Sequence, residues 1–107
     1  GLDRCLFLFP EDEWRTQEGK FRALSFTKQE ARRFKRFYFS GASELTCDRQ
    51  GRVLIPPYLK EYAGIKRDVI LVGVSNRIEI WDQEEWKKFY EQFKENYEQI
   101  AEKLLPD

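Results

Sequence analysis

Residues 48–64 read DRQGRVLIPPYLKEYAG, and the first half of this stretch predicts a tight β-hairpin. Asp48 and Arg52 flank a three-residue connection, in which Gly51 stands where a bulged hairpin needs a positive φ. The apolar run at 53–55, Val-Leu-Ile, suits a buried strand. A charged turn between two strands is therefore the starting point for predicting the fold.

The second half of the stretch predicts a short helix directly after the hairpin. Two prolines stop the strand, and the second of them, Pro57, suits the first position of a helix. Apolar side chains follow at helical spacing, and Gly64 can close the helix in the left-handed conformation. The expected order is strand, turn, strand and short helix.

This stretch and three flanking segments resemble a known family. The Asp-x-x-x-Arg spacing before a strand that ends in Ile-Pro resembles the AbrB-type swapped-hairpin DNA-binding unit. Residues 1–10 (GLDRCLFLFP), 39–44 (FSGASE) and 72–81 (VGVSNRIEIW) resemble, in family order, the bacterial MraZ transcription regulators. The resemblance implies an α+β fold: a swapped-hairpin β-barrel with short helices, a long C-terminal amphipathic helix and two tandem repeats.

An internal repeat is visible in the chain itself. Residues 1–14 (GLDRCLFLFPEDEW) align without a gap on residues 73–86 (GVSNRIEIWDQEEW), so that residue 1 matches residue 73 at an offset of 72. In the second copy the 48–64 stretch precedes the aligned segment, but nothing precedes the first copy. We therefore expect residues 1–39 to be the remainder of a first repeat, a strand plus two helices. Residues 40–107 are expected to be a complete second repeat with its C-terminal helix.

The absence of methionine agrees with an incomplete first copy, because such a chain does not begin at an encoded start unless that residue was removed. We expect a truncation that removed the hairpin and helix of the first repeat. The alternative is a chance match between two amphipathic strand-to-helix junctions. A lone hairpin leaves an open edge and an uncovered apolar face, so we expect self-association, as a swapped dimer or as part of a ring.

Residue types exclude several function classes. At 107 residues and 41% hydrophobic content the chain suits one domain with a modest core, and no apolar run has the length of a membrane span. We expect a soluble, cytoplasmic, nucleoid-associated protein without a membrane partner. Histidine, the commonest general base and zinc ligand, is absent. The sequence also has no glycine-rich phosphate loop. We expect no enzymatic activity, no metal and no cofactor.

The two cysteines, Cys5 and Cys47, are too few for a disulfide scaffold. Each alternates with apolar neighbours in a predicted strand, so both are expected to be small buried side chains. A redox pair between them is the alternative.

Helical periodicity organises the rest of the chain. A long helix is expected from Asp82, which caps it together with Glu85, and it carries an apolar stripe at three-and-four spacing. The stripe packs either in the core or against a neighbouring subunit. Its members are Trp86, Phe89, Tyr90, Phe93, Tyr97, Ile100, Ala101 and Leu104.

Two helices are expected before the hairpin. One runs from near Pro10 toward Leu24 and buries Trp14, Phe21 and Leu24, with Gly19 weakening it. The other begins at Thr27, whose hydroxyl can cap it with Glu30. Its buried side chains are expected to be Ala31, Phe34 and Tyr38.

Charge is balanced overall but segregated along the chain. Nineteen basic and nineteen acidic residues give zero net charge, so affinity for nucleic acid must come from local clusters. Residues 20–36 hold seven basic residues and one acid, whereas residues 82–107 hold eight acids and four bases. One side of the protein should be basic and the other acidic.

Arginines in two places are candidates for contact with DNA. Arg49 and Arg52 lie at or beside the hairpin turn, where guanidinium groups can reach phosphates or guanine edges, and Asp48 structures the turn. Arg52 can also pair with Asp48 to hold the turn closed, and the two roles are compatible. Secondary DNA contacts are expected on the helix after Thr27, where the alternative is a solvated face; these residues are Arg32, Arg33 and Arg36.

The resemblance implies the function. In the MraZ family the hairpin arginine is implicated in DNA binding, and subunits assemble into closed rings on short tandem repeats upstream of the cell division and cell wall operon. Matched onto this chain, it implicates Asp48, Arg49 and Arg52. We predict a DNA-binding transcriptional regulator, either a repressor or an activator, whose partners are double-stranded operator DNA and further copies of itself. The alternative is a protein-interaction or antitoxin-like module in which the aromatic C-terminal helix binds a protein.

Overall fold

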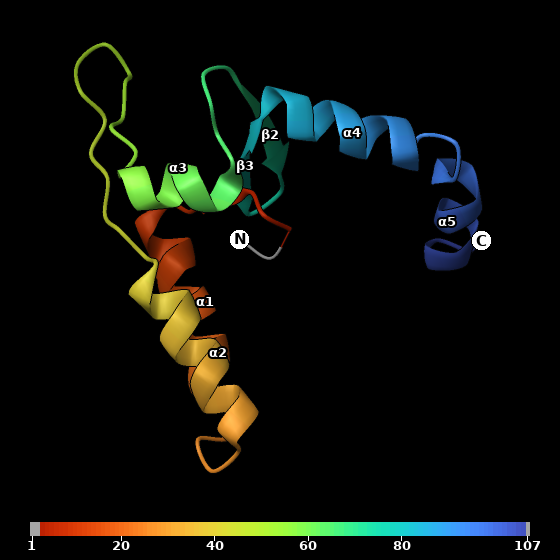
Figure 1. The fold of residues 1–107 in the computed structure, drawn as a ribbon. Coiled ribbons are helices and arrows are strands. Elements are labelled where there is room, and N and C mark those ends of the chain that lie inside the picture. Colours follow the sequence, from red (N-terminus) through yellow and green to blue (C-terminus); the bar gives the residue numbers. More distant parts are fainter. Residues whose placement is uncertain (1–2, 107) are drawn as a thin grey trace.

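An antiparallel sheet joins the two halves of the chain in the computed structural model, which describes residues 3–106. The central strand is β3 (Arg77–Asp82), which pairs with β1 (Leu6–Leu8) on one side and with β2 (Val69–Val74) on the other. One short helix packs on this sheet and two helical pairs extend away from it (Figure 1). The predicted mixed class of helices with an antiparallel sheet is confirmed, and the swapped-hairpin barrel stays a prediction.

The pairing of β1 with β3 brings equivalent strands of the internal repeat together. Leu6 lies opposite Ile80, Phe7 opposite Glu79 and Leu8 opposite Ile78. At the offset of 72 residues, Leu6 corresponds to Ile78, Phe7 to Glu79 and Leu8 to Ile80. The two strands are therefore related by a local two-fold axis through the Phe7–Glu79 pair. Gly1 and Leu2, which open the first copy, lie outside the described residues.

The helices leave the sheet in different directions (Figure 1). Below it, α1 (Glu11–Arg22) and α2 (Gln29–Ser40) form a helical hairpin, whereas α4 (Gln83–Phe93) and α5 (Tyr97–Leu104) extend to one side. The short α3 (Pro57–Ala63) packs on the sheet. Within residues 3–106, no helix combines the length and the apolar character needed to cross a bilayer.

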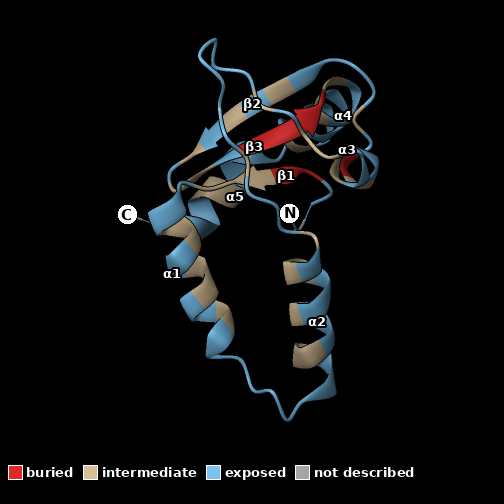
Figure 2. Cartoon of the chain, turned by 90° about the vertical axis from the view of Figure 1, so that its left-hand side faces the viewer, coloured by how far each residue is buried: buried red, intermediate tan, exposed pale blue. Residues whose placement is uncertain are grey.

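The buried core is small and lies between α3 and the sheet (red in Figure 2). Leu6, Ala63 and Ile80 form its buried cluster, and five partly buried side chains pack against it: Leu8, Ile55, Leu59, Tyr62 and Ile65. The radius of gyration is 16.2 Å, against about 13 Å for a compact chain of this length. The accessible surface is 9109 Å², roughly 2,800 Å² more than a compact monomer of this mass exposes. A single copy therefore leaves much apolar surface in water.

Aromatic rings hold α1 against α2. The ring centroid of Phe21 lies 4.5 Å from that of Tyr38 and 5.4 Å from that of Phe34, and Trp14 lies 6.0 Å from Tyr38. Burial raises the pKa of the Tyr38 hydroxyl. Trp14, Phe21 and Tyr38 are half-buried, while Phe34 and Leu24 remain 37% and 40% exposed. The predicted burial is thus confirmed for Trp14, Phe21 and Tyr38, whereas Phe34 and Leu24 are more exposed than predicted.

Two of the predicted helix boundaries are wrong. The helix α2 begins at Gln29, because the hydroxyl of Thr27 bonds that of Ser25 at 2.8 Å and caps nothing. The long C-terminal helix is divided into α4 and α5 at Asn96, whose N–H bonds the carbonyl of Phe93 in a tighter turn. Asparagine is a weak helix former, which explains why the chain can turn there.

Both ends of the short helix after the hairpin are confirmed. Pro57 occupies its first turn, and Gly64 follows it with a φ of 65°. The N–H of Ile65 donates to the carbonyl of Lys60 at 2.9 Å, which satisfies the last turn. Proline and glycine therefore fix this helix locally, and its apolar side then packs on the sheet.

The strands predicted on either side of the turn are wrong for this chain alone. The two arms, residues 42–47 and 53–56, have no regular structure, and Leu54 is 85% exposed. Cys47 in the first arm is exposed, contrary to prediction, whereas Cys5 is fully buried, and both thiols are free. Burial raises the pKa of the Cys5 thiol to about 11. A two-stranded ribbon with no apolar layer to pack on is marginal, which explains the irregular arms.

Asp82 joins the sheet to α4, as the predicted cap required. Its Oδ2 accepts hydrogen bonds from the N–H groups of Glu84 and Glu85 at 3.1 and 3.3 Å. Its Oδ1 accepts from the N–H of Lys66 at 3.2 Å. These bonds, that from Lys66 first, lower the pKa of the Asp82 carboxyl although the side chain is buried. One carboxylate thus satisfies three backbone donors.

Asp82→Ala should lower the free energy of unfolding at neutral pH by about 1 kcal/mol, the usual cost of losing an N-cap. Because the folded-state pKa of Asp82 is lowered, its contribution is present above the unfolded pKa, near about 4, and is lost as the pH falls through the folded pKa. Urea unfolding at fixed protein concentration, repeated at several pH values, measures this. Glu95→Ala, an exposed acid, is the control, and an equal loss there would contradict the role of Asp82.

Candidate nucleic-acid interface

The turn at residues 48–52, called here the Asp48 turn, is built around one carboxylate. Oδ1 of Asp48 accepts hydrogen bonds from the N–H groups of Gln50 and Arg52, both at 2.9 Å. Oδ2 accepts from Nε of Arg52, also at 2.9 Å. The main chain closes the turn: Asp48 N–H donates to the Arg52 carbonyl, and Gly51, with a φ of 78°, donates to the Asp48 carbonyl. The predicted turn, and the positive φ at Gly51, are confirmed.

Electrostatics alone do not account for the closed turn. Hydrogen bonds from Arg52, its N–H most strongly, and from the N–H of Gln50 lower the pKa of the Asp48 carboxyl. The side chains of Arg52 and Asp48 are 73% and 44% exposed, and ion pairs this exposed to water contribute little free energy. The fixed geometry of the three bonds to the carboxylate is therefore what orders the turn.

The structure answers the question of what Arg52 does within the turn. The pairing of Arg52 with Asp48 is confirmed, and it uses only Nε, so both outer guanidinium nitrogens point to no partner among residues 3–106. Arg49 is exposed and makes no hydrogen bond or ion pair within the same residues. The turn thus presents Arg49 and the outer half of Arg52 to solvent.

The Asp48 turn stands clear of the rest of the fold. It forms the tip of the long yellow-green loop that rises beyond α3 in Figure 1. The base of that loop is tied to α3, because the hydroxyl of Tyr58 donates to the carbonyl of Gly41 at 3.3 Å. A rigid turn on two irregular arms is therefore the most projecting basic feature of the chain.

The arginines of α2 do not extend this basic feature. The hairpin of α1 and α2 hangs on the opposite side of the sheet from the tip of the loop (Figure 1). Arg32 donates through Nη1 to the carbonyl of Phe26 at 2.8 Å, and Lys35 donates to that of Leu24 at 3.1 Å, so both close the α1–α2 connection. Arg33 and Arg36 are exposed and make no hydrogen bond or ion pair within residues 3–106.

A polar network on β3 was not predicted from the sequence. The guanidinium of Arg77 bonds Oε2 of Glu79 at 2.9 Å, and Nε1 of Trp81 donates to Oε1 at 3.1 Å. The same guanidinium lies 4.5 Å from the centre of the Phe7 ring. The signal was present, since Arg-x-Glu-x-Trp places all three side chains on one face of a strand. This network lies where β1 and β3 pair, and it links the two strands.

Comparison with known proteins decides the family. The chain matches a family model described as "MraZ protein, putative antitoxin-like" in two stretches, residues 1–37 and 38–106. The chain belongs to the MraZ family. Among similar proteins, each named transcriptional regulator MraZ, one from Syntrophomonas wolfei is 54% identical and one from Heliobacterium modesticaldum is 49% identical. One from Desulfitobacterium hafniense is 52% identical. Each match covers 98% of this chain and 73% of the relative.

The MraZ resemblance expected from the sequence is thus confirmed. The names of these relatives support a role in the regulation of transcription. The DNA-contacting roles expected for Arg49 and Arg52, and the secondary contacts expected for Arg32, Arg33 and Arg36, stay predictions. The geometry shows only which guanidinium groups are free to take such roles.

Asp48→Ala removes the acceptor of three hydrogen bonds, so the turn should open more often and expose its peptide bonds. We expect native-state trypsin cleavage after Arg49 and Arg52 to become several-fold faster, measured by mass spectrometry of the first fragments. Glu44→Ala, an acid of the first arm outside the turn, is the matched control and should leave the rate unchanged. Equal rates for Asp48→Ala and the unmodified chain would show that the carboxylate does not order the turn.

Proposed function

We propose that this MraZ protein is a transcriptional regulator that binds double-stranded DNA through the Asp48 turn. The observation that carries the proposal is a projecting turn whose Arg49 guanidinium, and the outer nitrogens of Arg52, have no protein partner within residues 3–106. Guanidinium groups form charge-assisted bonds with phosphates and paired bonds with guanine. A chain without net charge needs such a local feature to bind a polyanion.

Within this proposal each residue of the turn has its own role. Arg49 contacts DNA directly, and Arg52 does so through its outer nitrogens while Nε stays on Asp48. Asp48 is a positioning residue, because its carboxylate fixes the backbone that carries both arginines. A paired hairpin is narrow enough for the major groove of B-DNA. Arg32 is the weakest of the secondary candidates because it is engaged with the carbonyl of Phe26.

Self-association is the second part of the proposal. One copy exposes apolar side chains on the second arm and on the sheet, with Leu54 at 85% and Leu71 at 64% exposure. A second copy would supply strands for the irregular arms and cover this surface, as in a swapped dimer or a closed ring. Several turns on one particle would then bind successive operator repeats, and avidity would offset the few contacts of each turn. By resemblance, those repeats lie upstream of the cell division and cell wall operon.

A second candidate function is a protein-interaction module. The matching family is itself described as putative antitoxin-like, and aromatic rings are exposed on α4 and α5, with Tyr90 at 53% and Tyr97 at 61% exposure. An amphipathic helical surface of this kind suits a protein ligand. The two candidates differ in which surface is needed, the Asp48 turn or the C-terminal helices.

Arg49→Ala and Arg52→Ala should each weaken binding to operator-containing DNA about tenfold, in line with the loss of about 1–3 kcal/mol for a guanidinium contact to a base. Where the lost contact is to a phosphate, the salt dependence of binding should also become shallower. Gel-shift titration at several salt concentrations measures both effects, and light scattering verifies that oligomer size is unchanged.

Arg15→Ala is the matched control, because Arg15 also pairs with an acid four residues away, Glu11, at 2.7 Å, but lies on α1. It should bind DNA as the unmodified chain does. Unchanged binding in both turn variants would argue against DNA contact by the Asp48 turn and in favour of the protein-interaction candidate.

A further inference from the structure

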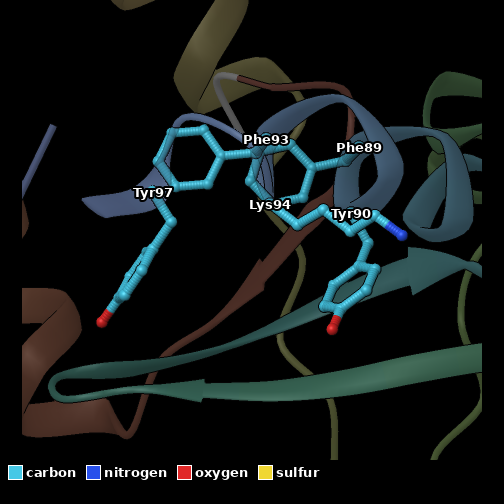
Figure 3. A pocket seen from close by; sticks show the side chains of 5 residues that line it. All are labelled: Phe89, Tyr90, Phe93, Lys94 and Tyr97. Carbon is cyan, nitrogen blue, oxygen red and sulfur yellow. The ribbon is translucent and has the colours of Figure 1, made fainter. Parts of the chain in front are cut away.

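The outer end of α4 and the start of α5 form an uncovered aromatic hollow of about 340 Å³, lined by Phe89, Tyr90, Phe93, Lys94 and Tyr97 (Figure 3). The rings of Phe89 and Phe93 stack at 5.7 Å, and that of Tyr97 meets Phe93 edge-on at 6.3 Å. Nothing else in the described chain packs a ring on Phe93. An aromatic surface this open is the kind that a protein element covers.

The internal repeat indicates what kind of element fits there. At the offset of 72 residues, α4 begins at the equivalent of the first residue of α1, and Phe93 corresponds to Phe21. In the first repeat, Phe21 is covered by rings from α2, whose centroids lie 4.5 to 5.8 Å from its own. The helix α2 is amphipathic and rich in aromatic and basic residues. The corresponding surface of α4 has only Tyr97 beside it. A helix like α2 is therefore the cover that this surface matches.

The outer face of α2, defined here by Arg33, Arg36 and Phe37, is largely exposed. Phe37 is 71% exposed, although its ring lies 6.3 Å from that of Tyr62, and both arginines are exposed. Arg33 and Arg36 lie about 100° to 160° around the helical wheel from Phe34 and Tyr38, the side chains that pack on α1, and Phe37 lies at the edge of the outer face, about 60° from Phe34. The outer face thus offers an aromatic ring beside two cations.

Charge favours contact between these two surfaces. The helix α2 carries four basic residues and one acid, whereas residues 82–106 carry seven acids and four bases. On α5, Glu98 and Glu102 lie four residues apart on one side and make no ion pair within the described chain. Attraction of opposite charges across an interface fixes the orientation of the partners and disfavours contact between two like surfaces.

We propose that the outer face of α2 of one copy docks on the aromatic hollow of a second copy, with Phe37 entering the hollow and Arg33 and Arg36 facing Glu98 and Glu102. The contact is between molecules, because within one chain α2 and the α4–α5 pair leave the sheet in different directions (Figure 1). The contact is head-to-tail, because each copy uses its α2 toward one neighbour and its aromatic hollow toward the other. Repeated contacts of this kind build either an open chain of copies or a closed ring. The inference rests on self-association in the proposed function and not on DNA binding.

Charge reversal tests this contact. The double variants Arg33→Glu/Arg36→Glu and Glu98→Lys/Glu102→Lys should each show an assembly mass at least twofold lower in sedimentation velocity. An equimolar mixture of the two should recover the mass of the unmodified chain, because every α2 then meets an oppositely charged α5. Recovery also shows that both variants fold. Lys20→Glu/Arg22→Glu, the same change of charge on α1, is the control and should keep the full mass.

Four results would overturn the proposal. Full mass in either double variant alone would show that these surfaces do not meet, and so would a mixture that stays small. A monomeric unmodified chain would overturn self-association as well. Loss of DNA binding in Arg33→Glu/Arg36→Glu at unchanged mass would instead assign these arginines to DNA. Phe37→Ser, at unchanged helix content, should give the same loss of mass as charge reversal, and full mass there would also overturn the proposal.

Discussion

The rest of the structure depends on the antiparallel pairing of β1 with β3. This pairing joins the first half of the chain to the second through a continuous sheet, and it places equivalent strands of the repeat about an axis at Phe7 and Glu79. On one face, Leu6 and Ile80 supply the buried cluster under α3. On the other, Glu79 binds Arg77 and Trp81, and the Arg77 guanidinium lies against the Phe7 ring. Both helical pairs leave from the ends of these two strands.

The small core is the physical reason to expect self-association of this protein. The sheet offers only a few strands, so α3 and its neighbours bury part of one face and leave Leu71 and Ile78 exposed. A chain with this much apolar surface gains free energy when a second copy covers it. The irregular arms of the Asp48 turn, which pair with no strand within residues 3–106, would become ordered in the same step.

The shape of the Asp48 turn is set by its own residues, whereas its position in the fold is set by residues outside it. A carboxylate that accepts two N–H bonds and one guanidinium bond orders the turn with no help from the sheet. The position of the turn, however, depends on α3 and on the contact between Tyr58 and Gly41. Its distance from the basic face of α2 follows from the opposite directions in which the two elements leave the sheet. The two arginine groups therefore lie on different surfaces of the chain.

The sequence by itself determined the features that depend on a few neighbouring residues. The cap at Asp82, the proline start and glycine end of α3, the positive φ at Gly51 and the pairing of Asp48 with Arg52 are all set by local hydrogen bonds. The family was readable for the same reason, because its motif is a local turn. The repeat was readable because it lies in the residue pattern.

Only the tertiary structure decided which residues found a partner at long range. Both Cys5 and Cys47 alternate with apolar neighbours, and this pattern predicted a buried strand for each. Only Cys5 is buried, and it lies in the segment that leads into the paired strand β1. Periodicity predicted one long C-terminal helix, but the stripe beyond Phe93 packs on no core that would hold it straight, and the chain turns at Asn96. Burial and strand pairing depend on residues distant in the chain, and local patterns carry no information about whether those residues are present.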